Sequence, residues 1–232
     1  MLLAIDAGNT NVVVAVYDGD VQKCLWRCQT NSGRTSDEYA AWLYQLFTKE
    51  GLSFDQITDA IISSVVPDAN HQLTQLCINS FGCDPFMVSY ETVHLPTKLD
   101  KPSEIGADRV VNAIAVQAAY SCPAIVIDFG TATTFDVIDG QGNYCGGVIA
   151  PGVNLSMDAL YRAAAKLPKI SIQKTQSVIG KDTVSAMQSG VYWGYVSMIE
   201  GMLNRIIQEM GEDPVVIAKG GLSSLFSQTV PA

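Results

Sequence analysis

Two segments of this chain repeat one pattern, and the repeat limits the folds that the sequence can adopt. Residues 2–28 read LLAIDAGNTNVVVAVYDGDVQKCLWRC, and residues 124–149 read AIVIDFGTATTFDVIDGQGNYCGGVI. Each begins with an apolar run that ends in Ile-Asp, passes through a glycine-containing polar turn, and continues as two more β-rich runs separated by a turn. This pattern predicts an antiparallel three-stranded meander. Two copies with the same Ile-Asp-x-Gly head indicate an internal duplication.

The turns within each copy have physical reasons. Gly8 and Gly130 let the backbone bend directly after a carboxylate. Asp18-Gly19 and Asp139-Gly140 are predicted to supply the left-handed conformations that tight hairpins require. Both copies should therefore fold as hairpins with their Asp residues at the same strand end.

Strand and helix patterns alternate between and after the two meanders. We expect an α/β fold with two similar halves, at residues 1–114 and 115–232, because 232 residues suit two small domains. Ser36 is predicted to cap the first helix. The residues from Thr92 to Ile105 are predicted to form a loop. The expected helices are Ser36–Lys49, Asn70–Phe81, Glu104–Tyr120, Ser156–Lys166 and Thr183–Met210, and the further strands are Asp59–Val66, Asp84–Tyr90 and Val215–Ala218.

Composition excludes several classes of function. The formal net charge of −9 disfavours non-specific nucleic-acid binding, which depends on Lys and Arg. No apolar run is long enough to span a membrane, so no membrane partner is expected and a cytoplasmic location is the default. The six cysteines are scattered without a Cys-x-x-Cys pair, and we expect ordinary buried or half-buried thiols rather than a zinc or disulfide framework. A chain this acidic must concentrate positive potential, or recruit cations, at any site that binds a nucleotide.

The first turn, Asp6-Ala7-Gly8-Asn9-Thr10, is a candidate phosphate site. Backbone N–H groups, the Asn9 amide and the Thr10 hydroxyl can donate to phosphate oxygens, and Asp6 can hold Mg²⁺ through water. A plain hairpin with an Asx-turn is the alternative for this turn taken alone.

The second turn, from Asp128 to Thr134, strengthens the phosphate hypothesis. If the two halves fold alike, the turns face each other across a cleft, where Thr131 can donate to phosphate and Asp128 can hold a cation. The chain lacks G-x-x-x-x-G-K-[ST], which excludes a P-loop mechanism.

A third candidate is Gly106-Ala107-Asp108-Arg109, at the start of a predicted helix. Asp108 can accept a proton from a substrate hydroxyl while Arg109 binds a carboxylate. Helix capping explains the same Asp equally well. Three weaker candidates are the glycines from Gly146 to Gly152, a helix cap at Asp182 or Thr183, and Gly220-Gly221, where an adenine ring can lie against backbone.

Together these segments resemble the type III pantothenate kinase family of the acetate/sugar kinase, heat-shock cognate and actin superfamily. The resemblance runs in order along nearly the whole chain. It is carried by Asp6–Thr10, Glu104–Arg109, Ile127–Thr134, Gly146–Gly152 and Lys166-Leu167-Pro168. It implies two duplicated ribonuclease H-like, actin-like domains with a cleft between them.

The resemblance also implies roles for individual residues. ATP phosphates would lie along Asp6, Ala7, Gly8, Asn9, Thr10, Asn11, Val12 and Val13, with Thr131 also touching ATP. Pantothenate would contact Gly106, Ala107, Asp108, Arg109 and Thr183, with Asp108 as the catalytic base. Mg²⁺ would lie near Asp6, and K⁺ or NH₄⁺ would bind at Asp128. The resemblance further implies a homodimer that makes 4′-phosphopantothenate, the first step toward coenzyme A.

This chain departs from the family pattern at three places. Leu99 stands where a Tyr is usual, so a hydrogen bond in the substrate pocket is expected to be absent or supplied elsewhere. Lys219 stands where Thr usually precedes the Gly-Gly pair. The sequence ends at Ala232, where family members continue into a further C-terminal segment, so we expect either a truncated or unusual version of the family pattern or an incomplete nucleotide domain.

Two other functions fit the same residues. A non-catalytic regulator, such as a transcriptional accessory factor, would bind ligand without turning it over. A kinase of another hydroxy acid or sugar would share the fold, since a fold does not specify a substrate. Only the context of Gly106–Arg109 favours pantothenate.

Overall fold

The structure is a computed structural model that describes residues 1–163 and 167–226. The chain divides into two compact units. Unit 1 comprises residues 1–95 and 101–112, and unit 2 comprises residues 96–100 and 113–232.

Unit 1 is built on a five-stranded sheet in the order β3-β2-β1-β4-β5. The meander consists of β1 (Leu2–Ala7), β2 (Asn11–Asp18) and β3 (Val21–Gln29), paired antiparallel as predicted. The strands β4 (Asp59–Ser64) and β5 (Pro85–Met87) then add in parallel. Gly19 has a φ of 57°, which confirms the left-handed Asp-Gly turn between β2 and β3.

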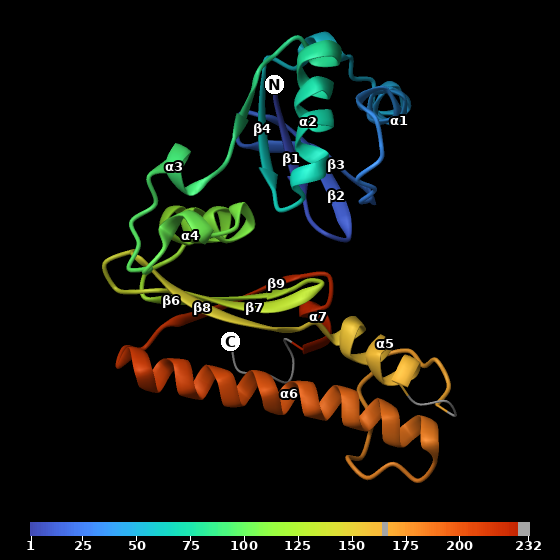
Figure 1. Ribbon diagram of the computed structural model, residues 1–232, viewed down its shortest axis with the longest axis vertical. Coiled ribbons are helices and arrows are strands. Elements are labelled where there is room, and N and C mark those ends of the chain that lie inside the picture. The colour runs from blue at the N-terminus through green and yellow to red at the C-terminus, as the bar shows by residue number, and fades with distance from the viewer. Residues whose placement is uncertain (164–166, 227–232) are drawn as a thin grey trace. The chain divides into compact units, whose positions relative to one another are not determined.

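Two helices, α1 (Ser36–Lys49) and α2 (Pro67–Leu76), cover one face of this sheet (Figure 1). Alternate residues of the strands, such as Leu3, Ile5 and Val14, pack with Leu43 and Leu73 of the helices in a single buried core. Apolar residues recur every two positions in the strands and every three to four in the helices, so each element presents one apolar face to this core.

Several predicted boundaries in unit 1 need correction. Thr35 rather than Ser36 caps α1, because the Thr35 side chain accepts from Glu38 N–H and the Glu38 side chain accepts in return. The helix predicted at Asn70–Phe81 starts at Pro67 and ends as a π-helical turn over Cys77–Phe81. Tyr90 starts a short helix, α3 (Tyr90–Val93), instead of ending a strand. Short 3₁₀ turns occupy Phe54–Gln56 and Pro102–Glu104, the second inside the predicted loop.

Unit 2 repeats the topology with a four-stranded sheet in the order β8-β7-β6-β9. The meander of β6 (Ala124–Phe129), β7 (Ala132–Ile138) and β8 (Tyr144–Pro151) is antiparallel, and β9 (Val215–Gly220) adds in parallel beside β6. In both units the first strand of the meander lies between its hairpin partner and a parallel strand. The predicted duplication is therefore confirmed.

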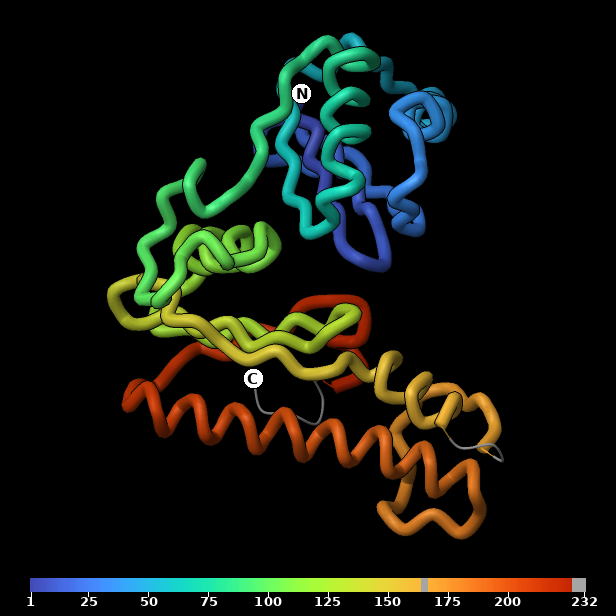
Figure 2. Tube along the Cα trace, viewed as in Figure 1, coloured from blue at the N-terminus to red at the C-terminus, as the bar shows by residue number. Residues whose placement is uncertain are grey.

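The helix α6 (Thr183–Met210) crosses one face of the unit 2 sheet, as Figure 2 shows along the orange part of the tube. Its buried residues Tyr192, Val196 and Ile199 pack against Ile125 and Ile127 of β6. The bounds of α6 are those predicted. The helix α5 (Val153–Ala163) starts earlier than the predicted Ser156, and residues 164–166 of that prediction lie outside the described part of the chain. A short helix, α7 (Ser223–Phe226), follows β9. The helix α4 (Ala107–Ala119) contains the division between the units.

The loop between β7 and β8 differs from the prediction. Gly142, with a φ of 82°, adopts the left-handed conformation expected of Gly140. The Asp139 carboxylate closes the loop by accepting from the N–H groups of Gln141 and Asn143, each at 2.9 Å. Asp139 is therefore a buried loop anchor rather than an ordinary turn residue.

Asp139 also anchors the segment Pro96–Asp100 to unit 2. Lys98 Nζ lies 2.7 Å from Asp139 Oδ2, and the Lys98 N–H donates to the Tyr144 carbonyl at 2.9 Å. Burial opposes the charged form of Asp139. The hydrogen bonds from Lys98, Asn143 and the N–H of Gln141 outweigh that penalty and hold the pKa of Asp139 well below its usual range.

Replacing Asp139 with Asn is expected to lower the free energy of unfolding by about 2–3 kcal/mol at neutral pH, since hydrogen bonds to a charged group are lost. Because the folded pKa is depressed, this stabilisation is present above the unfolded pKa of about 3.9 and disappears as pH falls through the lower folded value. Urea denaturation from pH 7 to pH 2 measures the difference. Asp18→Asn removes an exposed partner of Lys23 and serves as the matched control; an equal effect of both variants would contradict the anchoring role.

Within the described residues, no helix is long and apolar enough to cross a membrane.

Candidate active site

The first candidate turn lies at the end of β1 in unit 1. Asp6 is the penultimate residue of β1, in register with Val13 of β2 and Ser63 of β4. The Gly8 N–H donates to the Asn11 carbonyl at 3.0 Å and closes the turn. Asp6, Asn9, Thr10 and Asn11 are exposed, whereas Ala7 and Val12 are buried. The polar groups predicted to meet phosphate are thus on an accessible turn held by a buried strand pair.

Thr30, directly after β3, makes two hydrogen bonds to backbone carbonyl groups of this turn. Its hydroxyl donates to the Gly8 carbonyl at 2.6 Å, and its N–H donates to the Thr10 carbonyl at 2.9 Å. The C=O and N–H of a planar trans peptide point in opposite directions. Holding the Gly8 carbonyl toward Thr30 therefore directs the N–H of Asn9 away from β3, where it can donate to a ligand.

The third candidate segment starts α4. The Gly106 carbonyl accepts from the N–H groups of Arg109 and Val110, both at 3.1 Å, so Gly106 is the last residue before the helix. Asp108 Oδ1 accepts from the Arg109 N–H at 2.9 Å. A Cβ on Gly106 would lie 2.6 Å from Asp108 Oδ1, so the absence of a side chain at Gly106 makes room for the carboxylate. Asp108 is only half-buried and remains accessible to a substrate.

Val65 brings this segment next to the first turn. Its N–H donates to the Ala7 carbonyl at 3.0 Å. Its Cγ1 lies 3.5 Å from the Cβ position of Gly106. Val65 is therefore hydrogen-bonded to the end of β1 and lies beside Gly106, although the two candidate segments are about one hundred residues apart in the sequence.

The second candidate turn lies at the end of β6 in unit 2. Asp128 is the penultimate residue of β6, in register with Thr134 of β7 and Lys219 of β9. Lys219 Nζ lies 3.2 Å from Asp128 Oδ2, and the side chains are 44% and 21% exposed. Thr131, at the tip of the turn, is exposed. The carboxylate expected to hold a cation is thus paired with an ammonium group of the same chain.

Close backbone contacts shape this second turn. The Gly152 N–H donates to the Thr131 carbonyl at 3.1 Å, and a Cβ on Gly152 would lie 2.2 Å from that oxygen. Gly220, with a φ of 96°, packs so closely on Phe129 that a Cβ would lie 2.6 Å from the Phe129 carbonyl oxygen. Gly220 is therefore explained by packing, whereas a Cβ on Gly221 would meet no atom within 4 Å.

The predicted substrate-binding residue Thr183, and Leu99 at the position where the family usually has Tyr, lie elsewhere in unit 2. Thr183 is the exposed first residue of α6, after the N-cap Asp182. Leu99, at the expected Tyr position, has its Cδ2 3.3 Å from the Cβ position of Gly146.

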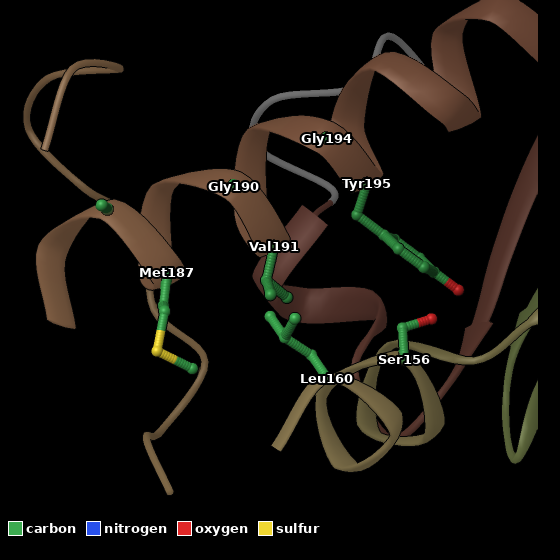
Figure 3. Close-up of a pocket in the computed structure, with 8 residues that line it drawn as sticks. Ser156, Leu160, Met187, Gly190, Val191, Gly194 and Tyr195 are labelled. Carbon is green, nitrogen blue, oxygen red and sulfur yellow. The ribbon is translucent and has the colours of Figure 1, made fainter. Parts of the chain in front are cut away.

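A pocket of about 400 Å³ lies between α5 and α6 (Figure 3). It is lined mainly by apolar side chains and glycines, including Leu160, Met187 and Val191, with Ser156 and Tyr195 at one side. It contains none of the predicted site residues.

Sequence reasoning missed two residues that support the turns. Thr30 supports the first turn through the bonds described above. Tyr195 OH supports the region of the second turn by bonding to Thr133 Oγ1 and donating to the Pro151 carbonyl at 3.1 Å. Each lies outside its motif, and no pattern in the sequence marks either one.

The sequence profile of the type III pantothenate kinase family matches residues 2–205. This chain belongs to the type III pantothenate kinase family. Similar relatives include the type III pantothenate kinases of Paramagnetospirillum magneticum, 56% identical over 98% of this chain and 88% of the relative, and of Rhodospirillum rubrum, 54% identical over 100% of this chain and 91% of the relative. The type III pantothenate kinase of Gluconobacter oxydans is 50% identical over 100% of this chain and 86% of the relative.

Solved structures show the actin-like fold of this pantothenate kinase family member. A Campylobacter jejuni protein named for the Baf family has a TM-score of 0.63 and is 16% identical over 99% of this chain and 88% of its own. The ethanolamine utilization protein EutJ of Carboxydothermus hydrogenoformans has a TM-score of 0.55 and is 15% identical over 97% of this chain and 79% of its own. These likenesses confirm the duplicated ribonuclease H-like architecture.

The residues of this pantothenate kinase family member fit Mg²⁺ at the first turn. Asp6 is an exposed carboxylate beside the predicted phosphate donors. Mg²⁺ is commonly held by one or two carboxylates together with water and substrate phosphates. The described residues contain no group of three or more His, Cys, Asp or Glu placed to hold a metal ion.

Proposed function

We propose that this chain transfers the γ-phosphoryl group of ATP to the primary hydroxyl of pantothenate, which makes 4′-phosphopantothenate and ADP and begins coenzyme A synthesis. The proposal is supported by the position of Val65, which is hydrogen-bonded to Ala7 of the first segment and lies beside Gly106 of the other. Phosphoryl transfer requires a phosphate-binding turn and a base within one site, since catalysis is largely positioning and charge stabilisation.

The proposed roles follow from the chemistry of each group. The turn from Asp6 to Val13 holds the ATP phosphates in unit 1, with Thr131 as a further contact to ATP from unit 2. Asp108 accepts the proton of the attacking hydroxyl, and Arg109 pairs with the pantothenate carboxylate. Gly106, Ala107 and Thr183 line the pantothenate site. Mg²⁺ near Asp6 would neutralise phosphate charge.

The surroundings of Asp128 bear on whether it binds a monovalent cation. K⁺ or NH₄⁺ would require the Asp128 carboxylate as a ligand, but Lys219 Nζ already lies 3.2 Å from that carboxylate. The residues present therefore fit a free monovalent cation poorly, and no step of the mechanism is assigned to one.

The function is tested by incubating the purified chain with Mg²⁺, ATP and pantothenate and measuring phosphopantothenate directly. Pantothenate is expected to be phosphorylated, whereas glycerate, acetate and hexoses in parallel reactions are not. Turnover of one of those acceptors instead of pantothenate would support the kinase of another substrate. ATP binding without turnover of any acceptor would support the regulator.

We further propose that the chain acts as a cytoplasmic homodimer. All six cysteines are free thiols, as is usual in reducing compartments. Unit 2 exposes large apolar side chains, including Ile149 (68%), Val178 (64%) and Ile179 (78%), which a partner subunit would cover.

Ile179→Asp is expected to convert the dimer to a monomer, because a charge would be buried at the interface. Light scattering during size-exclusion chromatography measures the change in mass. Val21→Asp alters a similarly exposed residue of unit 1 and should leave the dimer intact. A wild-type chain that elutes as a monomer would contradict the proposal.

A further inference from the structure

The second turn, at Asp128, has the ammonium group of Lys219 beside it. No Lys or Arg occurs in the sequence from residue 124 to residue 138, so the turn itself contributes no positive side chain. The carboxylate of Asp128 would repel the phosphates of a nucleotide at this turn. A positive charge beside the carboxylate would offset this repulsion.

Lys219 is held where it can supply that charge. Asp128 and Lys219 are register partners on the adjacent parallel strands β6 and β9. The next pair in register, Phe129 and Gly220, is in close backbone contact, with the Cβ position of Gly220 2.6 Å from the Phe129 oxygen and 2.8 Å from its nitrogen. This contact fixes the ends of both strands and so places the base of the Lys219 side chain relative to Asp128.

An ordinary surface ion pair is the simpler explanation, and such pairs contribute little to stability. Two features distinguish this one. The Asp128 side chain is only 21% exposed, and the pair lies beside the turn where Thr131 is proposed to contact ATP. An ammonium group there offsets the carboxylate charge that would otherwise repel the ATP phosphates.

We propose that the Lys219 ammonium takes the place of a monovalent cation at Asp128, so that nucleotide binding by this chain does not require K⁺. The inference rests on the proposed function, because it presumes that ATP phosphates lie at this turn. Lys219 acts by neutralising Asp128 and is a positioning residue rather than a catalytic one.

The test measures the Kd of Mg-ATP by calorimetry in K⁺ and in Na⁺ at equal ionic strength, with pantothenate turnover measured alongside. Wild-type affinity is expected to be the same in both salts. Lys219→Met keeps the length of the side chain and removes its charge. We expect this variant to bind ATP about tenfold more weakly in Na⁺, since a charge-assisted interaction is lost, and to regain affinity in K⁺ or NH₄⁺.

Lys23→Met is the matched control, because it removes a Lys of similar exposure (41%) from an ion pair with Asp18 in unit 1. It should bind ATP as wild type does in every salt. Wild-type binding that depends on K⁺, or a Lys219→Met variant that matches wild type in both salts, would overturn the inference while leaving the kinase proposal intact. A wild-type chain that binds no ATP in any salt would overturn both.

Discussion

Replacing Asp108 with Asn is expected to reduce the kcat for pantothenate phosphorylation about 10²- to 10⁴-fold, the usual contribution of a positioned general base. The amide cannot accept the hydroxyl proton. Its Oδ1 can still accept from the Arg109 N–H, as the carboxylate oxygen does at 2.9 Å, so the start of α4 should be preserved. Initial-rate kinetics with Mg-ATP measures the loss.

The binding of ATP to this variant should be unchanged, because the phosphate turn is formed by other residues. Asp100→Asn, at an exposed carboxylate eight residues upstream, is the control and should retain full turnover. Wild-type kcat in Asp108→Asn would exclude Asp108 as the base. Loss of ATP affinity together with kcat would indicate that Asp108 shapes the turn instead.

Replacing Gly152 with Ala is expected to lower the free energy of unfolding by about 1–3 kcal/mol, because the added carbon must displace backbone atoms of unit 2. The Cβ would lie 2.2 Å from the Thr131 carbonyl oxygen and 2.7 Å from that of Gly130. Neither oxygen can move without a shift of the second turn. Weaker ATP binding should therefore accompany the lower stability.

Thermal unfolding and ATP titration of the same samples measure both effects. Gly221→Ala is the control for stability, since a Cβ at that position meets no atom within 4 Å. A Gly152→Ala variant with wild-type stability would show that the two backbone segments can separate freely. Reduced stability with unchanged ATP affinity would show that the second turn does not contact the nucleotide.

The strands and long helices were predictable because each has a strong periodic pattern. The bounds of α1 and α6 agree with the prediction, and both meanders formed where the Ile-Asp-x-Gly heads indicated. The ends of helices that depend on side-chain hydrogen bonds were less predictable. Thr35 and Ser36 are both good caps, and only the reciprocal bonds with Glu38 show that Thr35 is used.

The residues of the candidate site also fall into two groups, those that the sequence identified and those that it missed. Motifs and family resemblance identified Asp6, Asp108 and Asp128 as candidates from the sequence alone, and their roles stay proposals. They did not identify Thr30, whose bonds to Gly8 and Thr10 depend on how β3 returns along β2. Tyr195 was missed for the same reason, because its partner Thr133 is 62 residues away.

The sequence by itself determined the duplicated α/β architecture, the family and the candidate turns, because local periodicity and ordered motifs are properties of neighbouring residues. Only the tertiary structure decided which distant residues meet. Val65 bonds to the Ala7 carbonyl and lies beside Gly106 because parallel pairing carries the chain after β4 past the end of β1. Lys219 meets Asp128 because the parallel register of β9 with β6 places them side by side, although 90 intervening residues separate them in the chain.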